Sequence, residues 1–207
     1  MTNLISNNAG PLLETERLIL RPPMVGDLDF LLGMNQDPIV MEFMPGLMSE
    51  DDTRRQLERM IQHFAEHGFG TWIAVLRAAD TAVGAVGLKH VDLDVAFAPA
   101  VEIAWRLARA NWGHGYATEA ARQVMRFGFQ QLHLERIVGF TVPRNQRSLA
   151  VFGRLGMEHD TSFDFEHPKL PPGHPLRSHV FYQMDRAQAP RLSLISGLKL
   201  VCSEVEQ

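Results

Sequence analysis

The sequence predicts a mixed α/β fold: a single domain built on a mostly antiparallel sheet of about seven strands, with helices on both faces. Two observations lead to this fold class. Strand-like runs follow one another directly in the middle of the chain, which is typical of an antiparallel meander. Further along, strand-like and helix-like segments alternate, which indicates parallel pairing. The length of 207 residues, with 45% hydrophobic and 21% charged residues, fits one domain of ordinary globular composition.

Three parts follow from the patterning of the chain. Residues 1–12 are expected to be a flexible lead-in, residues 13–185 the domain, and residues 186–207 a C-terminal extension. Apolar runs on either side of Ser196-Gly197 allow the extension to form a small hairpin, and a disordered end is equally compatible with them. If the extension is ordered, its apolar side could cover a second subunit, so a homodimer is one expectation.

The elements of the domain can be assigned from periodicity and turn residues. Strands are predicted at 17–21, 71–77, 82–90, 101–107 and 136–142. Helices are predicted at 27–35, 49–68, 115–131 and 145–155. Segments 159–165 and 179–184 are expected to pair as a final hairpin across the proline-rich loop 168–175.

The helix that starts at Ser49 has the clearest boundaries. Ser49 is a favoured N-cap residue, and Asp52 stands three residues later, where a capping box has an acidic or amide side chain. Leu57, Ile61 and Phe64 recur at helical spacing, and Gly68 is a typical C-terminal stop.

Composition excludes several classes of protein. The formal net charge of −4 argues against a general nucleic-acid binder. Cys202 is the only cysteine, so an intrachain disulfide is impossible and a reducing compartment is the default. Because the N-terminus lacks a signal pattern and no apolar run reaches spanning length, a cytoplasmic protein without membrane contact is expected.

The histidines do not predict a metal site. His159, His167, His174 and His179 lie near one another in the sequence, but their spacing matches no metal motif and no cysteine is close to them. The expectation is therefore a protein without a metal ion.

A turn with two glycines precedes the predicted helix at 115–131. Gly113 and Gly115 allow a ligand to approach the backbone, and the first amides of the helix have no intrahelical partner. Together with the positive end of the helix dipole, they predict a pyrophosphate site, although such turns also occur as plain connectors. Thr118 stands where a dinucleotide fingerprint needs glycine, and no Gly-Lys-Ser/Thr is present for a P-loop.

The residues around this turn resemble a known family. Val-Glu-Ile-Ala-Trp-Arg-Leu at 101–107, followed by Trp-Gly-His-Gly-Tyr-Ala-Thr-Glu-Ala at 112–120, is similar to the GNAT N-acetyltransferase superfamily. The opening segment 13–21, and Asn145-x-x-Ser148 followed by Leu-Gly-Met at 155–157, resemble the branch that acetylates the N-termini of ribosomal proteins.

The resemblance implies acetyl-CoA as cofactor and a sheet that splays apart between strands 101–107 and 136–142. Pantetheine would lie in this gap beside the backbone of Trp105 and Leu107, and the pyrophosphate would lie on the amides of 113–118. The cofactor-binding residues implied in this way are Trp105, Leu107, Trp112, Gly113, His114, Gly115, Tyr116, Ala117, Thr118, Asn145, Ser148 and Phe152.

Glu102 and Ser148 are the candidate catalytic residues. Glu102 stands where family members often have a carboxylate that deprotonates the acceptor amine; the alternative is an ion pair with Arg106 or with a neighbouring strand. Many relatives have a tyrosine that protonates the leaving sulfur, but Phe152 occupies that position here. Ser148, one helical turn earlier, is the available donor, unless it only contacts pantetheine.

One further difference from the family concerns the phosphate turn, and three acidic residues are candidates for attracting the acceptor. Many relatives have glutamine or arginine where Ala110 stands, and Arg109 is a substitute phosphate ligand or a plain surface residue. Glu42, Asp164 and Glu166 could attract a cationic amine or could be ordinary solvated carboxylates.

The function implied is transfer of an acetyl group from acetyl-CoA to a primary amine by direct attack in a ternary complex. The acceptor is a protein N-terminus or a small-molecule amine, and the sequence does not choose between them. The alternative is a non-catalytic protein that binds or senses acyl-CoA.

Overall fold

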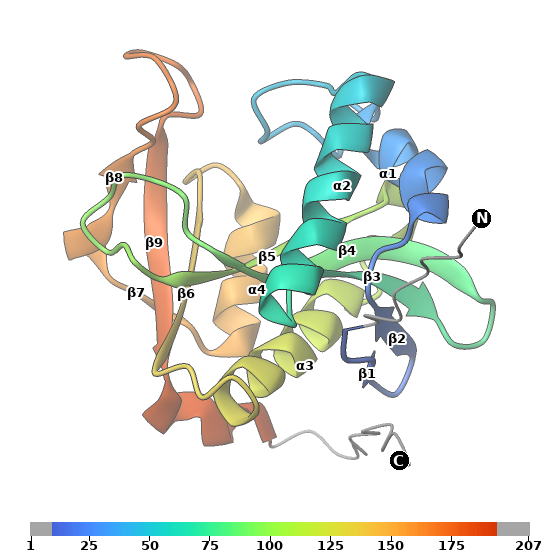
Figure 1. The fold of residues 1–207 in the computed structure, drawn as a ribbon. Helices are drawn as coiled ribbons and strands as arrows, with labels where there is room; N and C mark the ends of the chain where they lie inside the picture. Colours follow the sequence, from blue (N-terminus) through green and yellow to red (C-terminus); the bar gives the residue numbers. More distant parts are fainter. Residues whose placement is uncertain (1–9, 194–207) are drawn as a thin grey trace.

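Apolar residues in alternation build one open sheet that runs through the whole domain (Figure 1). The computed structural model describes residues 10–193. The strands follow the order β1-β2-β3-β4-β5-β6-β9-β7, and β8 pairs with β9 beside this path. The strands are β1 (Leu13–Glu14), β2 (Leu18–Arg21), β3 (Thr71–Leu76), β4 (Thr81–His90), β5 (Val101–Leu107), β6 (Arg136–Thr141), β7 (Glu158–His159), β8 (Phe165–Glu166) and β9 (Ser178–Asp185).

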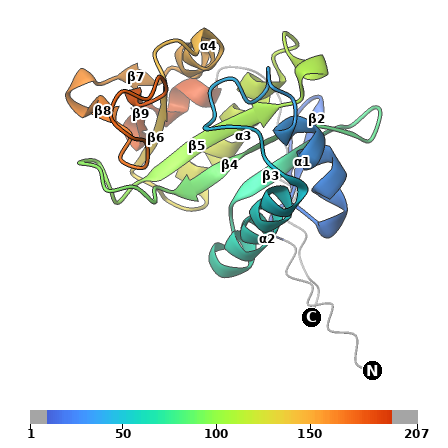
Figure 2. The same ribbon diagram turned by 90° about the horizontal axis from the view of Figure 1, so that it is seen from above.

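Four α-helices accompany the sheet in the described part of the chain, on both of its faces as predicted (Figure 2). They are α1 (Leu28–Asn35), α2 (Glu50–His67), α3 (Tyr116–Gln130) and α4 (Gln146–Leu155). The predicted boundaries of α2 are confirmed: Ser49 accepts a hydrogen bond from the Asp52 amide, and Gly68 closes the helix with φ +70°.

The two faces of the sheet bury separate sets of apolar side chains. Ile73 packs with α1 and α2, in a cluster that includes Leu31 and Leu57. Trp72, the preceding residue on the same strand, belongs to a larger cluster with α3. This alternation is what a strand covered on both sides requires. No helix within the described residues combines the length and the apolarity needed to span a bilayer.

The sheet opens between β5 and β6, as the resemblance implied. Strands β4 and β5 are paired along seven residues, whereas β5 and β6 run parallel and share a single register pair, Glu102 with Val138. From Ile103 onward, β5 therefore has a pairing partner on one side only. This fork in the sheet is the feature on which the functional site depends.

The predicted strand at 159–165 is wrong as a continuous element. It is divided into β7 and β8 by a 3₁₀ turn at Thr161–Phe163, where the Asp160 carboxylate accepts hydrogen bonds from the amide and the hydroxyl of Ser162. A short acidic side chain that binds the backbone two residues ahead favours a turn over a strand. Both halves still pair antiparallel with β9, so the hairpin topology is as predicted.

The start of the C-terminal extension is helical. Arg186–Ser193 forms a 3₁₀ helix directly after β9, and Leu192 is buried against the main core. The predicted hairpin begins at Leu192, and residues 194–207, which make up most of it, lie outside the described residues, as do residues 1–9 of the lead-in.

Candidate active site

One long cleft of about 1780 Å³ runs along the fork of the sheet. Its walls come from β5, the turn before α3, α4, α2 and the loop between β8 and β9. Pockets for drug-sized ligands usually measure about 300–1,000 Å³, so this cleft has room for an elongated cofactor together with a second molecule. Both predicted catalytic residues and all twelve predicted cofactor-binding residues line it.

The two-glycine turn forms one end of the cleft. Gly113 and Gly115 both have φ of +80°, a left-handed conformation that other residues adopt only with strain. Gly115 is the N-cap of α3, so the helix begins at Tyr116 and its first amides face away from their own helix. Free donors of this kind, with the helix dipole behind them, favour the binding of an anion.

Trp112 holds this turn against the end of β5. Its indole Nε1 donates to the carbonyl oxygen of Leu107 at 2.9 Å, and the guanidinium of Arg147 lies 4.5 Å from the centre of its ring. Arg147 belongs to α4, so the contact links the two walls of the fork. The Leu107 carbonyl, which belongs to one of the two residues predicted to contact pantetheine through the backbone, is therefore already bonded to the indole.

Three arginines that the sequence did not single out, Arg17, Arg122 and Arg154, line the same cleft. Arg17 lies over the Tyr116 ring at 4.7 Å, and Arg122 donates to the Arg154 carbonyl at 3.1 Å. Arg109, which the sequence offered as a substitute phosphate ligand or as a plain surface residue, is exposed in a 3₁₀ turn outside this cleft. The helical spacing from the glycines to Arg122, one to two turns into α3, is a signal that could have identified it.

Asn145 organises the start of α4. Its Oδ1 accepts from the Ser148 amide at 3.2 Å, which caps the helix, and its Nδ2 donates to Thr141 Oγ1 and to Ser148 Oγ, both at 3.0 Å. The Ser148 oxygen is therefore an acceptor toward Asn145, which leaves its own proton free to donate. A half-buried hydroxyl oriented in this way can stabilise a developing negative charge.

Phe152 is part of the core beneath the cleft. Its ring is 2% exposed, stacks on Tyr182 at 4.7 Å and meets Trp105 edge-on at 5.0 Å. A Cβ placed on Gly139 would come within 2.5 Å of this ring, so the side chain is pressed against the backbone of β6. Phe152 thus supports the floor of the cleft and carries no polar group toward it.

Glu102 is the buried acidic residue of the cleft wall. The residue is 7% exposed, and its Oε2 lies 3.4 Å from Lys89 Nζ on β4. Burial raises the pKa of the Glu102 carboxyl, and the attraction of Lys89 offsets only part of this rise. Of the two ion pairs considered from the sequence, the one with a neighbouring strand forms and the one with Arg106 does not. Although Glu102 is paired with Lys89, it still lines the cleft.

Arg106 lies on the same strand face as Glu102 and also lines the cleft. Its Nη1 is 3.3 Å from the Met41 sulfur, in the segment between α1 and α2, and its buried Nε lacks a hydrogen-bond partner among the described residues. Burial lowers the pKa of the Arg106 guanidinium. No carboxylate of the described chain forms an ion pair with it, which leaves its charge available to a ligand.

The loop between β8 and β9 closes the far wall. His167, Leu170, Leu176 and His179 line the cleft there, and burial lowers the pKa of both histidines. The acidic residues considered for amine attraction are engaged elsewhere. Glu42 pairs with Arg147, Asp164 with His159, and Glu166 with Arg177.

An open mixed sheet with a cleft at its fork, and free backbone amides at one end of that cleft, is the arrangement that the resemblance implied for an acetyl-CoA-dependent transferase. A model of the "Acetyltransferase (GNAT) domain" matches residues 17–158. The chain belongs to this family and is an acetyl-CoA-dependent acetyltransferase, which transfers an acyl group to an amine.

Curated relatives and solved structures agree with this assignment. The chain is 31% identical over 172 residues to "FsC-acetyl coenzyme A-N(2)-transacetylase" of Aspergillus fumigatus, covering 80% of this chain and 72% of that protein. It is 30% identical to "Uncharacterized N-acetyltransferase p20" of Bacillus licheniformis over 70% of this chain and 82% of that protein. A crystal structure of an acetyltransferase from Agrobacterium tumefaciens superposes with a TM-score of 0.70 at 27% identity, covering 89% of this chain and 98% of the other.

Proposed function

We propose that the protein acetylates a primary amine by direct transfer within a ternary complex, with Glu102 as the general base and Ser148 as the donor to the leaving sulfur. The observation that carries this proposal is the buried Glu102 carboxylate on the wall of a cleft that also holds the phosphate turn. The sequence contains no cysteine within residues 10–193, which favours direct attack over an acetyl-cysteine intermediate.

The reaction requires a base whose strength depends on the acceptor. A lysine-like amine is deprotonated at pH 7 at a cost of roughly 4–5 kcal/mol, whereas a chain N-terminus costs about 1 kcal/mol. A carboxylate whose pKa is raised by burial accepts a proton more readily than one in water, and Glu102 has this property. Its burial therefore matches the role of a base.

The proposed transfer has two steps. The neutral amine attacks the thioester carbon, and a C–N bond forms while Glu102 takes the amine proton. The C–S bond then breaks, and the sulfur leaves as a thiolate whose charge is stabilised by a hydrogen bond from the Ser148 hydroxyl. Asn145 holds that hydroxyl in the donating orientation. The acceptor can be a small-molecule amine or a protein N-terminus.

Arg106 supports one chemical class of acceptor. A buried guanidinium without a carboxylate partner among the described residues favours an acceptor that brings its own anion. Because Arg106 touches Met41 on the α1–α2 side of the sheet, away from the phosphate turn at α3, we assign this charge to the acceptor rather than to the cofactor. An amine that also bears a carboxylate fits this arrangement.

A thiol-release assay with acetyl-CoA and a panel of acceptors tests the proposal. The panel contains amino acids, polyamines, aminoglycosides and short peptides with free N-termini. We expect acceptor-dependent release of coenzyme A, fastest with amines that bear a carboxylate, and an Arg106→Gln variant that raises the KM of those acceptors without changing the KM of acetyl-CoA. Tight acetyl-CoA binding without turnover on any acceptor would contradict the proposal and favour the acyl-CoA-binding alternative.

A further inference from the structure

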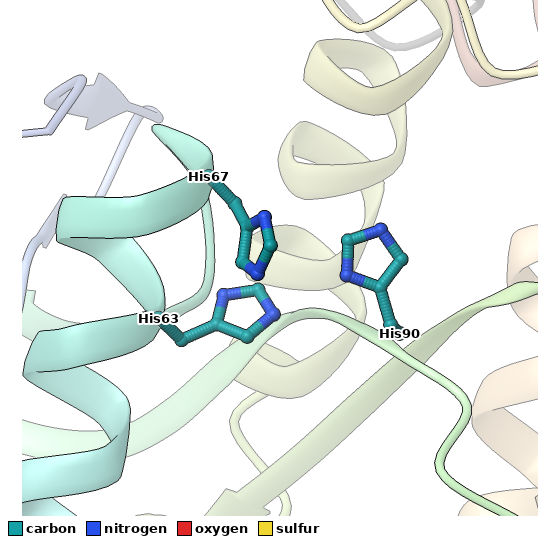
Figure 3. A group of neighbouring side chains, drawn as sticks. All are labelled: His63, His67 and His90. Carbon is teal, nitrogen blue, oxygen red and sulfur yellow. The ribbon is translucent and has the colours of Figure 1, made fainter.

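Three histidines that are separated in the sequence meet at the end of α2. His63 and His67 are four residues apart on this helix, and His90 is the last residue of β4 (Figure 3). Figure 3 shows their rings turned toward one another. One nitrogen from each lies within 4.8 Å of the others, and the ring centres are 4.5–5.7 Å apart.

His63 is already oriented as a metal ligand. Its Nδ1 lies 2.8 Å from the carbonyl oxygen of Phe69, and an acceptor at this position fixes the proton on Nδ1. Its Nε2 then presents a lone pair, and this nitrogen is buried without a partner among the described residues. Metal-binding histidines almost always donate their second nitrogen to a carbonyl or carboxylate in this way.

Local structure explains why this arrangement forms. Gly68 closes α2 in the left-handed conformation, which turns the chain so that the Phe69 carbonyl reaches back to His63. The Phe69 ring lies 5.3–6.0 Å from the three imidazoles and walls one side of the cluster. On the helix, the spacing of four residues places His63 and His67 on the same face.

The charges near the cluster are compatible with a cation. Glu66 Oε2 lies 3.8 Å from His67 Nε2 and adds a negative charge. Lys89, the residue before His90, has its Nζ 3.4 Å from Glu102 Oε2, so its positive charge is paired.

We propose that His63, His67 and His90 form a binding site for a divalent zinc ion, with the fourth position open to water. Zinc takes histidine nitrogens at about 2.0–2.1 Å in a tetrahedron, which places the nitrogens about 3.3 Å from one another. The present separations, which reach up to 4.8 Å, would have to shorten to this value, and the rings of His67 and His90 are exposed and not packed in the core. Sequence motifs did not show the site, because His90 follows His67 by 23 positions and joins it only through the fold.

Such an ion would join the last turn of α2 to the end of β4. His63 and Lys89 also line the active-site cleft, so the ion would brace the wall on which the acceptor lies. The zinc site does not depend on the proposed chemistry at Glu102, because its ligands are not the residues assigned to the reaction.

Calorimetric titration of the full-length, tag-free protein with ZnCl₂, after treatment with a chelator, tests the site. We expect one equivalent to bind. The variants His67→Ala and His90→Ala should each weaken binding by about 100-fold or more, since loss of a ligand exceeds the 10- to 100-fold effect of losing an outer-shell partner. These two positions are exposed, so replacing them leaves the core intact, whereas His63 is half-buried and bonded to the backbone.

His133→Asn is the matched control, because His133 is an exposed histidine outside the cluster and asparagine tolerates its positive φ of 53°. This variant should bind zinc as the unmodified protein does. At 100-fold excess over the Kd, zinc should raise the Tm of the unmodified protein and of the control by about 5–10 °C, and of neither ligand variant. Absence of zinc uptake by the unmodified protein, or unchanged affinity in His67→Ala and His90→Ala, would overturn the proposal.

Discussion

Glu102 is held out of water by the strands on either side of it, and this burial determines how its carboxyl responds to pH. The pKa of the carboxyl is raised, so below that pKa it is protonated and unable to accept the amine proton. Activity should therefore rise as the pH increases through the raised pKa and should level off above it.

Replacing Glu102 with Gln should lower kcat/KM at neutral pH by about 100-fold or more, the usual contribution of a positioned base. The acidic limb of the pH–rate profile should disappear as well, because glutamine does not titrate. Steady-state kinetics between pH 5 and 9 measure both effects. Glu135→Gln, at an exposed carboxylate in the segment between α3 and β6, is the control. Near-normal turnover of the Glu102 variant across this range would exclude the base assignment.

Lys89 offers a second test of the same residue. Its ammonium, 3.4 Å from Glu102, holds the pKa of that carboxyl below the value that burial alone would produce. A Lys89→Met variant should therefore shift the acidic limb to higher pH while the plateau rate stays similar. An unchanged limb in the pH–rate profile would show that the observed titration belongs to another group.

Ser148 is placed to donate to the departing sulfur. A hydrogen bond to a charged group contributes about 1.5–3 kcal/mol, so Ser148→Ala should lower kcat by about 10- to 100-fold. The KM of acetyl-CoA should change little, because the charge on sulfur develops only in the reaction. Rapid-quench or steady-state kinetics with Ser162→Ala as control measure this difference. An unchanged kcat with intact cofactor affinity would assign Ser148 a contact role only.

At the scale of elements, two glycines of similar exposure are expected to respond in opposite ways. Gly153 lies inside α4 and has open space at its Cβ position, so Gly153→Ala should stabilise the protein by about 0.5–1 kcal/mol. Gly113 also has open space, but its φ of +80° strains an alanine by about 1–2 kcal/mol.

Thermal unfolding and acetyl-CoA titration distinguish the two variants. The Tm of Gly153→Ala should rise by about 1–4 °C with unchanged cofactor affinity. Gly113→Ala should bind acetyl-CoA more weakly, because the strained turn no longer presents its amides in the same geometry. Equal cofactor affinity in both variants would show that the turn does not contact the phosphates.

The sequence was sufficient to predict elements whose signals are local. Ser49 and Gly68 mark the ends of α2 by their own hydrogen-bonding and backbone properties, and Gly113 and Gly115 mark the turn before α3. The break in the strand at 159–165 was missed because Asp160 favours a turn only through its bond to Ser162, which the alternating pattern does not show.

Contacts that depend on register could not be predicted in the same way. Lys89 meets Glu102 because β4 and β5 pair in one particular alignment. Arg106 reaches Met41 across 65 positions of sequence, and His90 reaches α2 through the path of β4. The resemblance to a family implied the fork of the sheet, but it did not imply these contacts between side chains.

For the whole molecule, the raised pKa of Glu102 predicts a cost in stability. The folded state holds the carboxyl proton more tightly than the unfolded chain, so stability is lost as the pH rises through the folded-state pKa. Glu102→Gln should therefore be more stable than the unmodified protein at pH 8, and its advantage should shrink at pH 5. Thermal unfolding at both pH values measures this. In the Glu102→Gln variant Lys89 loses its ion-pair partner, but Lys89 is half exposed, so this loss changes the free energy of unfolding little.

The single register pair between β5 and β6 has a consequence for the cooperativity of unfolding. Strands β1–β5 form one half of the sheet and β6–β9 the other, and their backbones meet only where Glu102 faces Val138. Without a bound molecule, the halves are otherwise coupled by α3 and by side chains such as Phe97, whose ring contacts Phe140, Phe165 and Phe181. Acetyl-CoA, lying along the fork, would tie the halves together, and amide exchange in β6 and α4 should then slow more than exchange in β3.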